Sequence, residues 1–299
     1  MTGETQWSAG RLARWSGPHA GHHRLLFGQM YEDAAIELDA FRDARRIFCI
    51  ASAGDTAIRL SRDHEVIACD INPVQLAYAR RRALGGPRET GDADRIMHLM
   101  RRLMPLVGWT SARIRTFLAL SDPAAQLAFW QQHLDNRRLR VGLSIAMSRP
   151  ALRTVYAREF LSLIPPHFGA VLRKRLQRGI GLHPNASNPY LRSLLTGEAT
   201  QLPPPASAIQ FLSGDAATVL EACAPASLDG FTLSNILDGA GSAYRVRLAQ
   251  AVRRAATPDA LVVLRSFSEP PAAMDANRAA CDRSMLWGVV EVRRALNFF

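Results

Sequence analysis

The sequence predicts an α/β fold, namely a doubly wound, Rossmann-like sheet whose sequence is interrupted by an α-helical insertion. Two short apolar runs in the first third are joined by a helix, which indicates parallel strands with a right-handed crossover. A long stretch with helical periodicity follows, and further apolar runs return after residue 206. The chain has 299 residues, 48% of them hydrophobic, which is enough to bury a full core.

The first unit is expected to run strand, helix, strand, helix. Residues 46–51 form an apolar run that ends in small residues, as a buried parallel strand does, and residues 56–61 can form a short helix. Residues 65–69 form a second strand that ends at Asp70. Pro73 suits the first position of a helix, which we expect to continue through residues 74–84.

Residues 85–205 carry no strand pattern. Helices are expected at residues 93–107, 111–120, 123–134, 150–164 and 167–178. Residues 179–205 are rich in Gly, Pro and Asn, so we expect a loop or lid that contains His183, Asn185, Asn188 and Tyr190. Exposure is the ordinary expectation for a histidine there, and a mobile gate over the site is the functional alternative.

Strand patterns return at residues 208–212, 230–233 and 260–265, with helices at 216–223 and 244–255 and an edge strand within 286–292. Residues 46–84 and 206–299 are therefore assigned to the sheet domain. Residues 85–205 are assigned to a basic helical cap that receives a substrate, and residues 1–45 to an N-terminal helical segment that contributes to the ligand site. Ligands of such sheets bind outside the carboxyl ends of the strands.

Positive charge is concentrated in the insertion. Between residues 123 and 182 ten basic residues stand against Asp135 and Glu159, so +8 of the net charge of +11 lies there. The region from Arg137 to Arg178 is either a solvated helix surface or one that attracts anionic lipid headgroups, through Arg149, Arg153 and residues 173–178. Few aromatic residues accompany this charge for base stacking, so no nucleic acid is expected as a partner.

The four cysteines lack CxxC spacing, and no cluster of residues has the spacing of a metal site. We therefore expect no metal and a reducing compartment. The sequence shows neither a long apolar run nor a secretory signal, so we expect a cytoplasmic protein, with peripheral attachment to the inner membrane face as an addition.

Polar and small residues follow each predicted strand, where they would line a ligand site. Ser52-Ala53-Gly54-Asp55 opens a helix after the first strand, and Asp70 after the second is placed to bind the hydroxyls of a ribose. Gly214 and Asp215 follow the third strand, and Ser234-Asn235 to Asp238 follow the fourth. Each of these acids is also a common helix cap. The sequence has neither GxGxxG nor GxxxxGK[ST], which argues against a dinucleotide or a P-loop site.

Taken together, four segments resemble the BtaA-type family, the S-adenosylmethionine:diacylglycerol 3-amino-3-carboxypropyltransferases of betaine-lipid synthesis. The segments are Phe27-Gly28-Gln29-Met30-Tyr31-Glu32-Asp33, Ile50-Ala51-Ser52-Ala53-Gly54-Asp55, Asp70-Ile71-Asn72-Pro73-Val74-Gln75-Leu76 and Ser234-Asn235-Ile236-Leu237-Asp238. Asp282-Arg283-Ser284 and Trp287-Gly288 are similar to that family's ending. The family usually has Trp where Tyr31 stands, so the acceptor stays open between diacylglycerol and another hydroxyl or amine.

The resemblance implies a class I S-adenosylmethionine-dependent transferase that attaches the 3-amino-3-carboxypropyl group to a hydroxyl of a lipid and releases methylthioadenosine. Tyr31, Glu32 and Asp238 are then the catalytic candidates. The cofactor-binding candidates are Gln29, Ser52, Ala53, Gly54, Asp55, Asp70, Asn72, Gln75, Gly214, Asp215, Ser234 and Asn235. Three alternatives stay open: a methyltransferase of a small molecule or RNA, a non-catalytic nucleotide-binding module, and, for Tyr31-Glu32-Asp33, an acidic helix start.

Overall fold

The structure is a computed structural model that describes residues 24–153, 161–206, 208–271 and 277–298. Within these ranges one sheet is formed by β1 (Arg46–Ile50), β2 (Glu65–Asp70), β3 (Ile209–Ser213), β4 (Leu228–Thr232), β5 (Ala256–Ser266) and β6 (Val289–Arg294). The order is β3-β2-β1-β4-β5-β6; the first five strands are parallel and β6 runs antiparallel to β5. The predicted α/β, Rossmann-like fold class with a C-terminal edge strand is confirmed.

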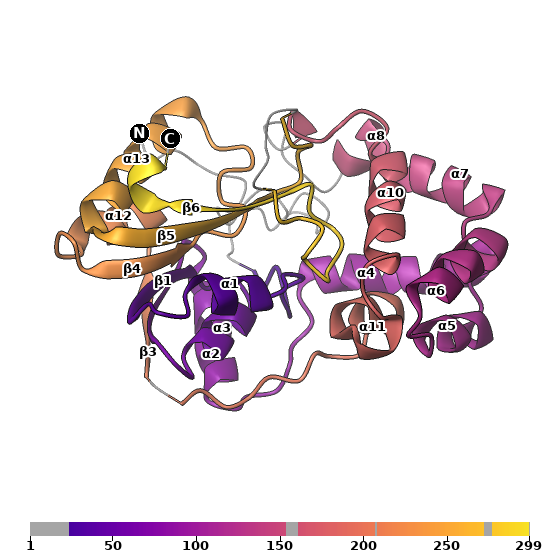
Figure 1. Ribbon diagram of the computed structural model, residues 1–299, viewed down its shortest axis with the longest axis horizontal. Helices are drawn as coiled ribbons and strands as arrows, with labels where there is room; N and C mark the ends of the chain where they lie inside the picture. The colour runs from indigo at the N-terminus through magenta and orange to yellow at the C-terminus, as the bar shows by residue number, and fades with distance from the viewer. Residues whose placement is uncertain (1–23, 154–160, 207, 272–276, 299) are drawn as a thin grey trace.

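Alternate residues of the central strands face opposite layers of helices. Ile47 and Cys49 of β1 pack with α1 (Ala35–Ala40), α2 (Asp55–Leu60) and α3 (Pro73–Ala83). Phe48 packs with α12 (Ala216–Ala222) and α13 (Ser242–Ala255) on the other face. Figure 1 shows the two layers on either side of the sheet. A strand that is buried on both faces requires this spacing of two.

The insertion forms a helical lobe beside the sheet, coloured magenta to salmon in Figure 1. Its described elements are α4 (Asp92–Leu103), η2 (Met104–Val107), α5 (Ser111–Leu118), α6 (Pro123–Phe129), η3 (Trp130–Leu134), α7 (Arg137–Ala146), α8 (Arg149–Arg153), α10 (Phe168–Ile180), η4 (Asn185–Ser187) and α11 (Pro189–Thr196). The lobe has a hydrophobic core of its own, in which Phe117, Trp130 and Leu134 are almost completely buried. Among the described helices, none is long and apolar enough to cross a membrane.

One expectation about the insertion is wrong, and one of its helices is absent from the prediction. Residues 179–205 do not form a single loop, because α10 continues to Ile180 and α11 begins at Pro189. Asn188 caps α11 by accepting hydrogen bonds from the backbone N–H groups of Tyr190 and Leu191, which is the standard role of Asn before a helix. The helix α7 was not expected. The helix expected at residues 150–164 is described only as α8, because residues 154–160 lie outside the described ranges.

The side chains expected in a loop or gate are held within the fold. Asn185, Asn188 and Tyr190 are buried. Asn185 donates to the carbonyl of Phe117 at 3.0 Å, and a ring nitrogen of His183 lies 2.8 Å from the carbonyl oxygen of Ala280. The expectation of an exposed histidine is therefore wrong, and the hydrogen bonds argue against a gate at this position.

Arg175 connects the insertion to the sheet domain, and its assignment to a surface cluster that attracts membranes is wrong. Its guanidinium is 4% exposed and donates to the carbonyl oxygens of Leu286 at 2.8 Å and Phe267 at 3.0 Å. It also pairs with Glu269. A buried guanidinium requires such partners, so this arginine serves packing between the two parts of the chain.

Candidate functional site

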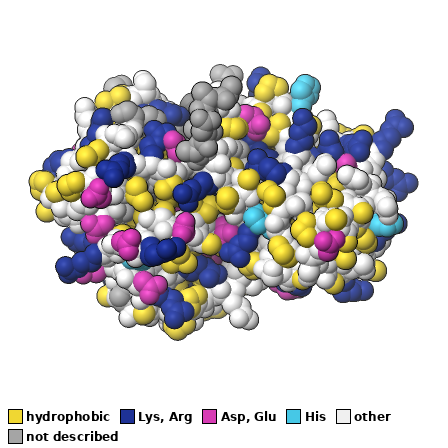
Figure 2. All heavy atoms as spheres, viewed as in Figure 1, with side chains coloured by type: hydrophobic (Ala, Val, Ile, Leu, Met, Phe, Trp, Pro, Cys, Tyr) yellow, Lys and Arg dark blue, Asp and Glu magenta, His cyan; other side chains and the backbone are white. Residues whose placement is uncertain are grey.

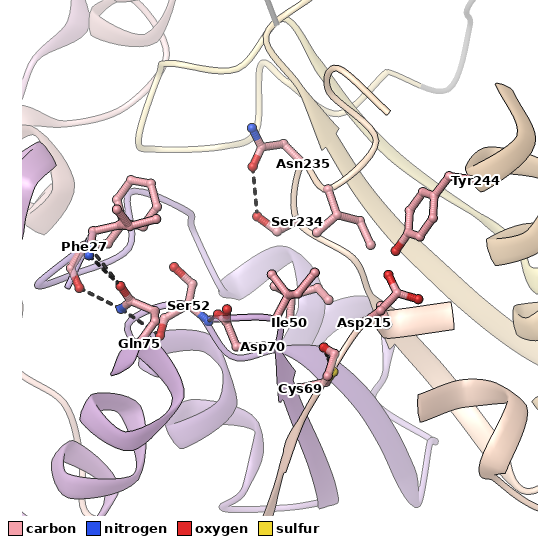
Figure 3. Close-up of a pocket in the computed structure, with 15 residues that line it drawn as sticks. Phe27, Ile50, Ser52, Cys69, Asp70, Gln75, Asp215, Ser234, Asn235 and Tyr244 are labelled. Atoms are coloured by element: carbon pink, nitrogen blue, oxygen red, sulfur yellow. Dashed lines mark hydrogen bonds between the residues drawn. The ribbon is translucent and has the colours of Figure 1, made fainter. Parts of the chain in front are cut away.

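A pocket with a volume of about 80 Å³ lies at the carboxyl ends of β1, β2, β3 and β4 (Figure 3). The predicted cofactor-binding residues that line it are Ser52, Asp70, Gln75, Gly214, Asp215, Ser234 and Asn235. Apolar and aromatic side chains complete the wall, among them Leu26, Phe27, Ile50, Ile71 and Tyr244. The sheet thus brings together strand ends that are far apart in the sequence, as expected for this topology.

Asp70 ends β2 and lies in the middle of the pocket (Figure 3). Its carboxylate accepts hydrogen bonds from the backbone N–H groups of Ser52 at 3.0 Å and Asn72 at 2.9 Å. Burial raises its pKa to about 7, and these two hydrogen bonds oppose the rise. Asp70 therefore changes protonation state near neutral pH and has lone pairs left for a ligand.

The backbone around the pocket contains unusual dihedral angles. Ser52 has φ 43°, and Ser234, after β4, has φ 50°. Gly54, at φ 90°, opens α2 in the same turn as Ser52. Left-handed backbone costs a residue with a side chain about 1–3 kcal/mol and is concentrated at functional sites. Both serines line the pocket, so the strain lies where a ligand would bind.

Tyr244 and Asp215 face each other at one end of the pocket (Figure 3). Burial raises the pKa of Tyr244, and the hydrogen bond to the Asp215 carboxylate raises it further. Asp215 also caps α12, because it accepts from the backbone N–H of Thr218 at 3.1 Å. Both interpretations of Asp215, as helix cap and as pocket residue, therefore hold. Tyr244 was missed by sequence reasoning, although a tyrosine in the first turn of an Arg- and Ala-rich helix was a usable signal.

Three predicted cofactor-binding residues have their hydrogen bonds taken up within the protein. Gln75 accepts from the backbone N–H groups of Leu26 and Phe27 and donates to the carbonyl oxygens of Phe27 and Ser52. Asn72 caps α3, and the buried Asp55 pairs with Arg82 at 2.5 Å. These side chains hold the segment from residue 24 to 30 and the first turn after β1, and Ala53 and Gly54 allow the close packing there.

Gln29 lies outside this pocket. It is buried, and its amide Nε2 lies 2.5 Å from the Ser193 hydroxyl oxygen of α11. Its Oε1 has no hydrogen-bond partner among the described residues. Its contact is therefore with the insertion, and its binding to a cofactor stays a prediction.

The catalytic candidate Asp238 lies in the loop after β4, and Glu32, which precedes α1, packs against the same loop. Glu32 is buried and accepts a hydrogen bond from the Ser234 hydroxyl. Asp238 accepts from the Ser266 hydroxyl at 2.6 Å and from the backbone N–H of Phe267 at 3.0 Å. Asn235 lies 3.4 Å from Asp238 and links the two acids through the same loop.

The protonation of these two acids is governed by burial. Burial raises the pKa of Glu32 to about 7, against the attraction of Arg265. Its Oε2 has no hydrogen-bond partner in the described part of the chain, although the guanidinium of Arg265 lies 3.6 Å away. Burial raises the pKa of Asp238 as well, opposed by its bond to Ser266. Glu32 is thus poised to take up a proton near neutral pH.

Arg265 at the end of β5 holds this acidic group together. Its side chain is completely buried, forms a bidentate pair with Glu37 and lies 3.1 Å from Asp282. It also donates to the backbone carbonyl of Asp33 at 3.1 Å. Sequence reasoning missed Arg265 and Glu37, yet an arginine that ends an apolar strand is itself a signal for a buried partner.

Tyr31 and Asp33 differ in their surroundings. Burial acts to raise the pKa of Asp33, but the guanidinium of Arg283 lowers it below the ordinary value. Asp33 also accepts from the backbone N–H of Ala35 at 3.1 Å, which fits the interpretation as an acidic helix start. The Tyr31 carbonyl accepts from the indole of Trp287 at 3.0 Å. The Tyr31 hydroxyl is buried without a hydrogen-bond partner among the described residues.

The fold and the pocket define a class: a doubly wound α/β protein with a ligand pocket at the carboxyl ends of its strands. Within the described ranges, no group of three or more His, Cys, Asp or Glu residues is placed to hold a metal ion.

Comparison with known proteins leaves the family open. No protein family and no curated protein matches the chain. Two solved structures of the rRNA methyltransferase aviRa from Streptomyces viridochromogenes are similar to it, each with a TM-score of 0.35. They are 15% and 14% identical and cover 91% and 90% of this chain and 88% and 87% of their own. A likeness this distant carries no argument about function.

Replacing Arg265 tests the buried acidic group. Arg265→Leu leaves Glu37 and Asp282 buried without their cation, so we expect the free energy of unfolding to fall by about 3–5 kcal/mol. The loss should be larger at pH 8 than at pH 5. Burial already raises the pKa of Asp282, and Arg265 opposes that rise. Without the cation the folded-state pKa of Asp282 rises further above its unfolded value, and a group shifted this way loses stability as the pH rises. Urea unfolding at both pH values measures this.

The matched control for that variant is Arg278→Leu. Arg278 pairs with Asp39 at 3.4 Å on the surface, where both side chains are about half exposed. We expect it to cost less than about 1 kcal/mol at either pH. Equal losses for the two arginines would contradict the role assigned to Arg265.

Proposed function

We propose that the protein is an S-adenosylmethionine-dependent transferase that moves the 3-amino-3-carboxypropyl group to a hydroxyl acceptor, diacylglycerol or a related lipid. The observation that carries the proposal is the convergence of Asp70, Asp215 and the Glu32–Ser234 pair at the carboxyl ends of neighbouring strands. The choice of the transferred group rests on the sequence resemblance.

The residues present fit the adenosine part of this cofactor. The carboxylate of Asp70 is placed to accept from the ribose hydroxyls, and Asp215 with Tyr244 provides acceptors for the adenine amino group. Ile50 and Ile71 supply apolar walls.

When bound, the cofactor would supply an electrophilic carbon beside its sulfonium, to which the acceptor oxygen would bond while the carbon–sulfur bond breaks and methylthioadenosine leaves. The chain's own task is to remove the proton of the acceptor hydroxyl. Ser234 lines the pocket and donates to Glu32. A proton taken from the acceptor therefore reaches Glu32 through the Ser234 hydroxyl.

Glu32 is the base favoured by its surroundings. Its pKa of about 7 matches the task at neutral pH. Asp238 already accepts from Ser266 and the backbone of Phe267, so it is better placed to position the loop after β4. Tyr31 stays a candidate for contact with the acceptor.

The basic surface of the insertion supports a peripheral role at the inner membrane face. Figure 2 shows Lys and Arg side chains along the edge of the helical lobe. Arg137 and Arg138 in α7 are exposed, and charges of this kind attract anionic lipids. An acceptor could then be taken from the bilayer by an enzyme that does not cross it.

The by-product tests the function directly. Purified protein is incubated with S-adenosylmethionine and diacylglycerol in mixed micelles, and the released nucleoside is identified by mass spectrometry. Methylthioadenosine, formed only when the acceptor is present, is the expected product. S-adenosylhomocysteine would instead establish the alternative of methyl transfer, and release of neither would contradict both.

Cofactor affinity should depend on the charge of Asp70. Because the ribose is bound by the carboxylate and the pKa of Asp70 is about 7, the dissociation constant should be about tenfold larger at pH 6 than at pH 8. Asp70→Asn should weaken binding and remove most of this pH dependence. Calorimetric titration measures both. Asp63→Asn, an exposed acid before β2, is the control and should bind as the unchanged protein does.

Glu32→Gln tests proton removal. We expect kcat to fall by about 10²–10⁴-fold with little change in cofactor affinity. In the unchanged enzyme kcat should rise with pH through about 7 as Glu32 loses its proton, and the variant should lack this rise. Glu65→Gln, at the exposed start of β2, is the control. An unchanged kcat in Glu32→Gln would exclude this residue as the base.

A further inference from the structure

The helical lobe contains a second and much larger cavity, of about 900 Å³. It lies between α4, α7, α10 and α11 and is lined by Leu, Met, Val, Ile and aromatic side chains. The only charged residues in its described lining are Arg101, Arg137 and Arg138. A cavity of this size is at the upper end of what small-molecule sites occupy, about 300–1,000 Å³.

The cavity reaches the surface through an apolar rim. Leu103, Leu106, Val141 and Ile145 line it and are between 43% and 69% exposed. Exposed apolar residues that gather at one place mark an interaction site rather than ordinary surface. The rim residues come from α4 and η2 on one side of the opening and from α7 on the other.

The positive charge of Arg137 and Arg138 indicates which kind of molecule the cavity can hold. Arg137 and Arg138 stand exposed at the start of α7 and have no ion pair with a described carboxylate. Trp130, which is 1% exposed, also lines the cavity, and its indole N–H has no hydrogen-bond partner among the described residues. An occupant should therefore be long and apolar and have a negative charge at one end.

We propose that this cavity binds the acyl chain of an anionic lipid, with the negatively charged head at Arg137 and Arg138. The apolar wall takes the chain, and Met97, Met100 and Met104 adapt to its shape because methionine is flexible. A free fatty acid and an anionic phospholipid share this chemistry. The proposal does not depend on the transfer reaction, because none of the residues assigned to cofactor binding or catalysis lines this cavity.

The cavity also touches the C-terminal loop that supports the acidic group. Leu286 lines the cavity, and its carbonyl accepts from Arg175. Its neighbour Trp287 donates to the Tyr31 carbonyl at 3.0 Å. A chain that fills the cavity therefore contacts the loop that packs against the Tyr31–Asp33 segment.

Binding of a fluorescent 16-carbon fatty acid to the full chain tests the proposal, with displacement by palmitate and by hexadecanol. We expect saturable binding that palmitate reverses and hexadecanol reverses poorly. The double variant Arg137→Glu/Arg138→Glu should weaken binding at least tenfold, on the basis of the usual contribution of two near-surface charges. Ala146→Trp, which places an indole ring among the lining residues, should also weaken it.

Matched controls separate this site from general charge effects and from the transfer site. Arg62→Glu/Arg80→Glu changes the same charge at exposed positions of the sheet domain and should bind the fatty acid normally. All variants should keep their S-adenosylmethionine affinity, so failure here is distinguishable from failure of the proposed function. Sedimentation with phosphatidylcholine vesicles, with and without phosphatidylglycerol, shows whether phospholipid as well as free acid is bound.

Several outcomes would overturn the proposal. Absence of fatty-acid binding would do so, as would binding that Ala146→Trp leaves intact. Equal displacement by hexadecanol would remove the role of the arginines. If the fatty acid binds only after residues 1–23 are deleted, the natural occupant of the cavity is that segment of the chain. If it binds only when an oligomer is diluted, the occupant is a second copy of the chain.

Discussion

A single buried cation organises the region that we assign to chemistry. Arg265 ends β5 and is enclosed by Glu37 and Asp282, with Glu32 nearby, so carboxylates from both ends of the chain meet at one guanidinium. Such groups are stable only if their charges balance and their hydrogen bonds are made. Glu32 is the exception, because one of its oxygens lacks a hydrogen bond and its pKa is raised to about 7. Arg265 thus holds the N-terminal segment in place, while burial raises the pKa of Glu32 against the attraction of this cation.

The C-terminal loop connects the two candidate ligand regions. Asp282 binds Arg265, Met285 packs into the core of the insertion, and Leu286 lines the apolar cavity. Gly288 has no side chain because a Cβ there would lie 1.9 Å from the Ser268 carbonyl oxygen. The polar pocket at the sheet edge and the apolar cavity in the insertion are therefore parts of one framework. This arrangement suits a protein that brings a polar cofactor and an apolar molecule together.

Much of the fold could be predicted because buried parallel strands are apolar runs bounded by small or polar residues. Residues 46–51 and 65–69 match β1 and β2 almost to the residue. The insertion was harder. Asn72-Pro73 and Asn188-Pro189 both mark the start of a helix. The second pair stands among further Gly and Pro residues that indicate a loop, so the local pattern does not predict α11. Strand-end acids such as Asp70 could be placed in the pocket, since topology brings such ends together. The saturated hydrogen bonds of Gln75 and the pairing of Arg265 with Glu37, 228 residues away, depend on tertiary contacts that no local pattern records.

The central claim is that the carboxyl ends of β1 to β4 hold an adenosyl compound beside Glu32. A crystal structure of the protein with bound S-adenosylhomocysteine tests it most directly. The account predicts both ribose hydroxyls within hydrogen-bond distance of the Asp70 carboxylate, the adenine near Asp215 and Tyr244, and the sulfur directed toward the loop that carries Ser234. A ligand bound elsewhere, or in this pocket with its ribose turned away from Asp70, would contradict it.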